Sequence, residues 1–173
     1  MAATVDFASL SLQDALDLAV LVEEEAQERY LDFVDQMEKH HTPEAARFFG
    51  TMARNEQRHG EDLRARRQAL FGDTPSGVKR SQLWDVEAPD YDQPRAFMSA
   101  RRAMEVALAS EKKAHKFFLL ALPHVTDTGV RLLFEELRDE EVLHQSLVRE
   151  AMNALSPEGP SEPADYEDPP VAQ

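Results

Sequence analysis

The chain has 173 residues, of which 42% are hydrophobic, and a formal net charge of −14. This length suits one domain with a sizeable core. The negative charge argues against nucleic acid or an anionic membrane surface as a partner. The absence of cysteine excludes disulfides, iron–sulfur clusters and thiolate metal sites. Any bound metal would therefore need oxygen and nitrogen ligands.

The first residues show no sign of a targeting or membrane-spanning segment. Residues 1–10 contain no basic cluster, and the apolar run 19–22 is far too short to cross a bilayer. We therefore expect a cytoplasmic protein that has no membrane partner.

Hydrophobic residues recur with helical spacing in four segments, and no segment alternates as a β-strand does. We predict helices over 11–39, 43–71, 94–122 and 127–155. The first and third connections are short, whereas residues 72–93 are numerous enough to run back along a helix of about 40 Å. The sequence thus predicts an all-α four-helix bundle with one long crossover between the second and third helices.

Residues typical of helix ends stand at the breaks between these segments. Ser11 and Thr42 are predicted N-caps, and Pro43 suits the first turn of the second helix. Residues 156–173 are rich in proline and acid and poor in apolar side chains, so we expect this tail to be disordered. The predicted domain therefore covers residues 1–155.

Each predicted helix has one glutamate near its middle, inside the apolar stripe, and two helices add a histidine three residues later. The six residues are Glu23, Glu56, His59, Glu111, Glu141 and His144. Burying an unpaired carboxylate costs several kcal/mol, so four at one level would repel one another unless cations neutralise them. Four carboxylates and two neutral imidazoles carry a charge of −4, which two divalent ions balance. The pattern predicts a buried two-ion site.

The Glu-x-x-His motif occurs three times, and its position separates one occurrence from the other two. Residues three apart share a helical face, so the motif alone is weak evidence. Glu38 and His41 lie beside the predicted first turn and are interpreted as surface residues. The motifs at 56/59 and 141/144 each follow an upstream glutamate. These two glutamates, Glu23 and Glu111, begin the related stretches EEEAQERY and EKKAHKFF. This repeat indicates a duplicated metal-binding hairpin. Glu140, which precedes Glu141 in the sequence, is interpreted as surface charge directed away from the site.

The ligand positions resemble those of the rubrerythrin and erythrin branch of ferritin-like di-iron proteins, in which two helices supply a glutamate and two supply Glu-x-x-His. The resemblance implies that Glu23 and Glu111 are terminal ligands of two iron ions. It implies that Glu56 and Glu141 bridge the ions and that each motif's histidine binds one. Manganese and zinc stay open as alternative metals, because both accept oxygen and nitrogen donors.

Further features of this family bear on the reaction. The resemblance covers residues 7–155 and implies that Tyr30 donates a hydrogen bond to a ligand. Full rubrerythrins add a cysteine-ligated rubredoxin centre, absent here, and an extra glutamate where this chain has Ala114. Peroxide reduction would therefore need an external electron-donor protein. The ligand set is closer to that of bacterioferritin, yet we expect a homodimer rather than a cage.

These observations predict a non-haem di-iron protein of iron homeostasis or oxidative stress defence. It would act as a ferroxidase or a peroxidase-type oxidoreductase, with Fe²⁺ and dioxygen or hydrogen peroxide as partners. Three alternatives stay open: an iron carrier or sensor without turnover, an oxygenase for an organic substrate, and a bundle whose glutamates and histidines only face solvent.

Overall fold

The computed structural model describes residues 6–80, 89 and 98–155. Within these residues the chain forms four α-helices and no strand, and none of the helices is long and apolar enough to cross a membrane. The predicted tail and the start of the predicted third helix, residues 94–97, lie outside the described residues. The elements are α1 (Leu12–Lys39), α2 (Pro43–Phe71), α3 (Ala100–Ala121), the short 3₁₀ helix η2 (Leu122–His124) and α4 (Thr128–Ala154).

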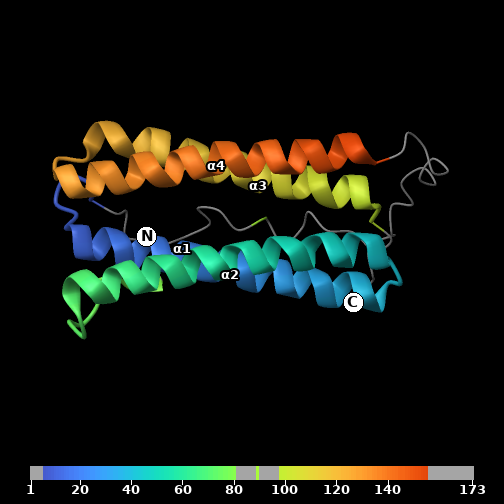
Figure 1. Ribbon diagram of the computed structural model, residues 1–173, viewed down its shortest axis with the longest axis horizontal. Helices are drawn as coiled ribbons and strands as arrows, with labels where there is room; N and C mark the ends of the chain where they lie inside the picture. Colours follow the sequence, from blue (N-terminus) through green and yellow to red (C-terminus); the bar gives the residue numbers. More distant parts are fainter. Residues whose placement is uncertain (1–5, 81–88, 90–97, 156–173) are drawn as a thin grey trace, which may run out of the picture.

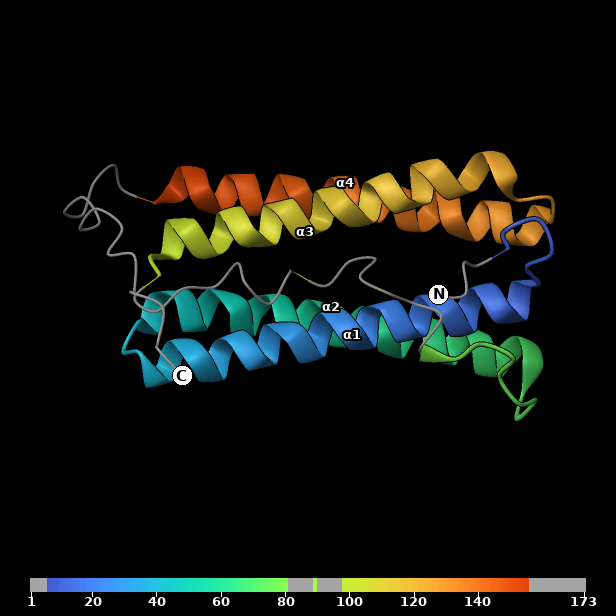
Figure 2. The same ribbon diagram turned by 180° about the vertical axis from the view of Figure 1, so that it is seen from behind.

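The helices form two hairpins, α1 with α2 and α3 with α4, which pack against each other lengthwise (Figure 1). α2 and α4 lie on one face of the bundle, and α1 and α3 lie on the opposite face (Figure 2). The turns of the two hairpins are at opposite ends, so the end of α2 and the start of α3 also lie at opposite ends of the bundle. The prediction of an all-α, ferritin-like four-helix bundle with one long crossover is confirmed.

Residues at the helix N-termini satisfy backbone amides that lack a partner within the helix. Ser11 caps α1 as predicted, because its Oγ accepts a hydrogen bond from the amide of Asp14 at 3.1 Å. Thr42 occupies the N-cap position of α2, but the expected cap is not formed. Its hydroxyl instead donates to the carbonyl of Met37 at 3.1 Å, and Pro43 follows as a first residue that has no amide hydrogen.

α3 begins later than the apolar pattern indicates. Met98 and Ser99 were predicted to be helical, but the helix starts at Ala100. Ser99 is the N-cap, and its Oγ accepts a hydrogen bond from the amide three residues further on at 3.2 Å. Leu122, the predicted last residue, lies in η2 rather than in α3. Periodicity identifies the buried face, but a capping serine decides where the helix begins.

The buried side chains form two apolar clusters with a polar layer between them. One cluster contains Phe118 and Phe134, and the other contains Phe33 and Phe49. The layer contains the four glutamates singled out above, each 5% exposed or less. Packing thus places charged groups in the middle of an otherwise apolar core, where they need compensation.

The turn between α1 and α2 contains a strained residue, His41, whose φ is 59°. This left-handed region is unfavourable for residues with a Cβ atom but accessible to glycine. We expect His41→Gly to raise the free energy of unfolding by roughly 0.5–1 kcal/mol. His40→Gly, where φ is −94°, relieves no strain and should be neutral or destabilising. Urea denaturation compares the two variants, and equal stability would contradict strain at residue 41.

Candidate metal centre

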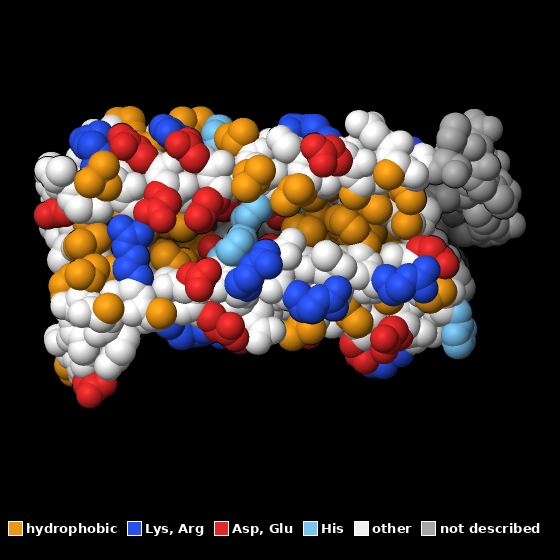
Figure 3. All heavy atoms as spheres, viewed as in Figure 1, with side chains coloured by type: hydrophobic (Ala, Val, Ile, Leu, Met, Phe, Trp, Pro, Cys, Tyr) orange, Lys and Arg blue, Asp and Glu red, His pale blue; other side chains and the backbone are white. Residues whose placement is uncertain are grey.

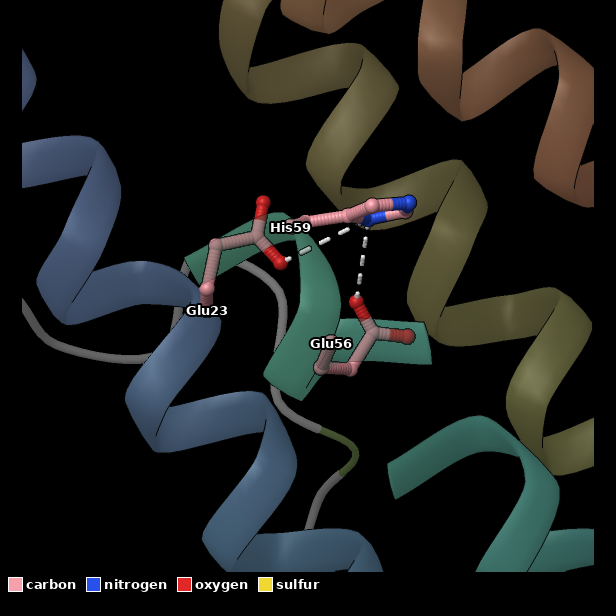
Figure 4. Close-up of side chains that lie close together, drawn as sticks. All are labelled: Glu23, Glu56 and His59. Carbon is pink, nitrogen blue, oxygen red and sulfur yellow. Dashed lines mark ion pairs between the residues drawn. The ribbon is translucent and has the colours of Figure 1, made fainter. Parts of the chain in front are cut away.

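One half of the candidate centre lies where α1 meets α2 (Figure 4). Glu23 extends from α1, and Glu56 and His59 extend from adjacent turns of α2. Nδ1 of His59 is 3.9 Å from Oε2 of Glu23 and 3.9 Å from Oε2 of Glu56. These distances are too long for hydrogen bonds, whereas ligands about 2.1 Å from one ion lie roughly 3–4 Å apart. The three side chains could therefore hold a metal ion.

The other half has the same composition and comes from α3 and α4. Glu111 extends from α3, and Glu141 and His144 extend from α4. Nδ1 of His144 is 3.2 Å from Oε2 of Glu111 and 3.9 Å from Oε2 of Glu141. All three residues are buried, and they too could hold a metal ion.

The two histidines bring the halves together. The rings of His59 and His144 stack with centroids 4.6 Å apart and an angle of 4° between their planes. Burial, followed by the positive charges of His144 and Arg58, lowers the pKa of His59 to about 4. The His59 ring is therefore neutral near pH 7, which is the protonation state that binds a metal.

The donor atoms fit a pair of divalent transition-metal ions. Nδ1 of His59 is buried and forms no hydrogen bond in the described structure, as expected of a nitrogen whose partner is a metal. The four carboxylates of the layer carry −4 if ionised, and burial among apolar side chains makes that charge costly without cations. Two divalent ions would balance it. Oxygen and nitrogen donors of this kind suit iron, manganese or zinc.

Tyr30 lies beside the second half of the centre. It is fully buried on α1, and its hydroxyl is 3.5 Å from Oε1 of Glu111. Its ring stacks on Phe49 with a centroid separation of 6.0 Å. The sequence suggested a hydrogen bond from Tyr30 to a ligand, and the structure brings the hydroxyl to the outer limit of hydrogen-bond distance from Glu111.

Two residues near the centre were not identified from the sequence. The amide of Gln145, a buried residue, donates to the backbone carbonyl of Glu111 at 3.5 Å, and Arg149 donates to Gln145 at 3.1 Å. Gly60 faces Glu23, and a Cβ atom added there would be 3.4 Å from the Cβ of Glu23. The missing side chain at Gly60 thus lets α1 approach α2 closely. Helical spacing gave no signal for either residue.

A pocket of about 90 Å³ opens beside the first half of the centre, between α2 and α4. Its lining consists of His59, Asp62, Leu63, Arg66 and Glu140. Figure 3 shows acidic and histidine side chains gathered beside a hollow near the middle of this face. Glu140 was interpreted as surface charge directed away from the site, and the predicted direction is wrong, because Glu140 lines the pocket beside His59. Burial, followed by the charge of Glu136, raises the pKa of the Glu140 carboxyl.

The third Glu-x-x-His motif does not join the centre. Glu38 and His41 are both exposed, at the end of α1 and in the following turn. Their interpretation as surface residues is confirmed.

The fold and the paired carboxylate–histidine groups define a ferritin-like helical bundle with a candidate metal centre. The model of the Rubrerythrin family matches residues 14–152, and the chain belongs to this family. A crystal structure of an uncharacterised conserved protein from Magnetospirillum magnetotacticum MS-1 is similar in fold, with a TM-score of 0.63 and 24% sequence identity. The similarity covers 88% of this chain and 100% of that one. No curated protein matches the chain.

Proposed function

We propose that the protein is a non-haem di-iron oxidoreductase of iron homeostasis or oxidative stress defence. It oxidises Fe²⁺ or reduces hydrogen peroxide at a pair of iron ions bridged by carboxylates. Glu23 and Glu111 would be the terminal ligands, Glu56 and Glu141 would be shared between the ions, and the histidine of each motif would bind one ion. Membership of the Rubrerythrin family supports iron as the metal.

The observation that carries this proposal is the meeting of two equivalent ligand groups in one buried layer. The two histidine rings are 4.6 Å apart, and each group contributes two carboxylates. A single divalent ion would leave a charge of −2 among apolar clusters, which is costly at low dielectric. Two ions are therefore favoured over one. A bound pair of iron ions would supply electron transfer to dioxygen or peroxide.

The chain's own residues would prepare the centre for that chemistry. Neutral imidazoles and ionised carboxylates offer lone pairs to cations, while the two apolar clusters shield the layer from bulk water on its two flanks. The hydroxyl of Tyr30 and the amide of Gln145 lie on opposite ends of Glu111, at its carboxylate and its backbone carbonyl. These contacts would hold Glu111 in a fixed orientation before a metal binds.

The source of electrons separates the two activities within this proposal. A ferroxidase takes them from Fe²⁺, which it consumes as a substrate. A peroxidase of this chain would take them from an external donor protein, because the sequence contains no cysteine for an electron-transfer centre of its own.

An iron carrier or sensor is the second candidate, and the charge of the chain favours it. A net charge of −14 concentrates cations near the surface, and acidic side chains line the pocket beside His59. This function requires tight binding of Fe²⁺ without its oxidation.

Anaerobic titration with Fe²⁺, followed by stopped-flow mixing with dioxygen or hydrogen peroxide, tests the proposal. We expect two Fe²⁺ per chain and a rapid rise of iron(III) absorbance. Glu56→Ala with Glu141→Ala should remove both signals, because each ion loses a shared carboxylate. The matched control is Glu38→Ala with His41→Ala, which removes the exposed third motif and should leave both signals intact.

The outcomes separate the candidates. Peroxide turnover with catalytic iron and an added reductant supports a peroxidase, whereas consumption of Fe²⁺ in proportion to the oxidant supports a ferroxidase. Stoichiometric binding without oxidation supports the carrier or sensor. Binding that survives the Glu56 and Glu141 substitutions would show that these residues are not the ligands.

A further inference from the structure

The two halves of the candidate centre differ in their access to solvent. The side chain of His59 is 19% exposed, whereas that of His144 is 9% exposed. His59 lines the pocket between α2 and α4, while the group around Glu111 is buried throughout. An ion held beside His59 would therefore be one side chain away from water.

The pocket has the size and charge of a path for a hydrated cation. A volume of about 90 Å³ accommodates a few water molecules. Asp62 and Glu140 line it, and Arg66, the basic residue of the lining, forms an ion pair at 2.7 Å with Glu136. The resulting negative potential favours cations over anions at the mouth of the pocket.

In the other half, Glu111 is held in place by several contacts. Oε2 of Glu111 is 3.2 Å from Nδ1 of His144, and Oε1 is 3.5 Å from the hydroxyl of Tyr30. Gln145 contacts the backbone of the same residue, and Arg149 in turn holds Gln145. In the first half, Nδ1 of His59 is 3.9 Å from both carboxylates. Releasing an ion from the second half would require disturbing a braced ligand inside the core.

We propose that the two ion positions are kinetically distinct: the Glu23–Glu56–His59 position exchanges its ion through the pocket, and the Glu111–Glu141–His144 position retains its ion. This inference rests on the proposed two-ion centre. It makes the first position the one through which substrate Fe²⁺ would arrive, and the second the position of a resident ion.

Removal of Co²⁺ from the loaded full-length protein tests the inference without any catalytic assay. Co²⁺ bound to oxygen and nitrogen ligands absorbs visible light, so its loss to excess EDTA can be followed over time. We expect two phases of equal amplitude whose rate constants differ on the order of tenfold or more. His59→Ala should remove the fast phase, and its counterpart His144→Ala should remove the slow phase.

A variant of the pocket gives a second test that leaves the six ligands in place. Asp62→Asn with Glu140→Gln removes negative charge from the path, and it should slow the stopped-flow uptake of Co²⁺ in the fast phase alone. The slow phase and the final stoichiometry should not change. Circular dichroism of each variant checks that the helices are retained.

The results distinguish a failure of this inference from a failure of the proposed function. Two Co²⁺ per chain that leave in a single phase, or a fast phase that survives His59→Ala, would overturn the inference and leave the two-ion centre standing. Loading of fewer than two Co²⁺ per wild-type chain at saturation would overturn the centre and the inference together.

Discussion

Removing metal from the wild-type protein is expected to lower its unfolding temperature by about 8–16 °C, and Glu56→Gln with Glu141→Gln should abolish this difference. A ligand at a thousandfold excess over its Kd stabilises the folded state by about 4 kcal/mol. For a chain of this size each kcal/mol shifts the unfolding temperature by about 2–4 °C. The two glutamines offer no negative charge to cations, so added metal should no longer stabilise the variant.

The same variant should unfold at a higher temperature than the metal-free wild-type protein. Glu56 and Glu141 are 1% and 3% exposed, and their carboxylates share the layer with two further glutamates. Replacing two of the four with neutral residues of equal size relieves repulsion by on the order of 1 kcal/mol or more. A metal-binding residue thus stabilises the loaded protein and destabilises the empty one.

Differential scanning calorimetry with Mn²⁺, and after dialysis against EDTA, measures both effects. Glu38→Gln, at an exposed position of α1, is the matched control and should behave as the wild type does. A metal-dependent shift that persists in the double variant would place the binding site elsewhere. A metal-free double variant less stable than the metal-free wild type would show that the carboxylates do not repel one another.

Leu133→Ala is expected to lower the free energy of unfolding by about 2–5 kcal/mol, the range for truncating a buried leucine. Leu133 is fully buried in the cluster that contains Phe134, whereas the neighbouring Leu132 is 59% exposed. Leu132→Ala should therefore change stability by only about 0.5 kcal/mol. Because the two substitutions are chemically identical and adjacent on α4, their difference reports burial alone.

This pair of variants also tests the rotation of α4 about its axis. Leu133 and Leu137 lie on the same buried stripe as Glu141 and His144. Denaturation in guanidinium chloride gives the two free energies. If Leu132→Ala proved the more costly change, α4 would be rotated, and Glu141 and His144 would not face the other helices as described.

The helices themselves could largely be predicted from the sequence, because helical periodicity is a local property. The predicted bounds of α2 match the observed ones, and those of α1 and α4 agree within one residue at each end. The start of α3 was wrong because the capping role of Ser99 leaves no trace in the apolar pattern. Thr42 was assigned a cap from its position, but its hydroxyl donates to the carbonyl of Met37 and accepts no hydrogen bond from an amide of α2.

The candidate centre could be assembled from the sequence for a related reason. A glutamate in the middle of an apolar stripe must enter the core, and four at similar heights must meet if the helices form one bundle. The structure does bring the six residues into two groups within one layer. That these six residues bind iron stays a prediction, which the anaerobic titration with Fe²⁺ tests.

The sequence by itself determined the class of fold, the buried face of each helix and the height of the carboxylate layer, because these follow from spacing along single helices. Only the tertiary structure decided how the helices rotate and approach one another, since that depends on packing between residues far apart in the chain. Packing stacks His59 on His144, places Tyr30 beside Glu111 and makes Glu140 part of the lining of a pocket. It also leaves His59 partly exposed beside that pocket and buries His144, although the two histidines belong to the same repeated motif.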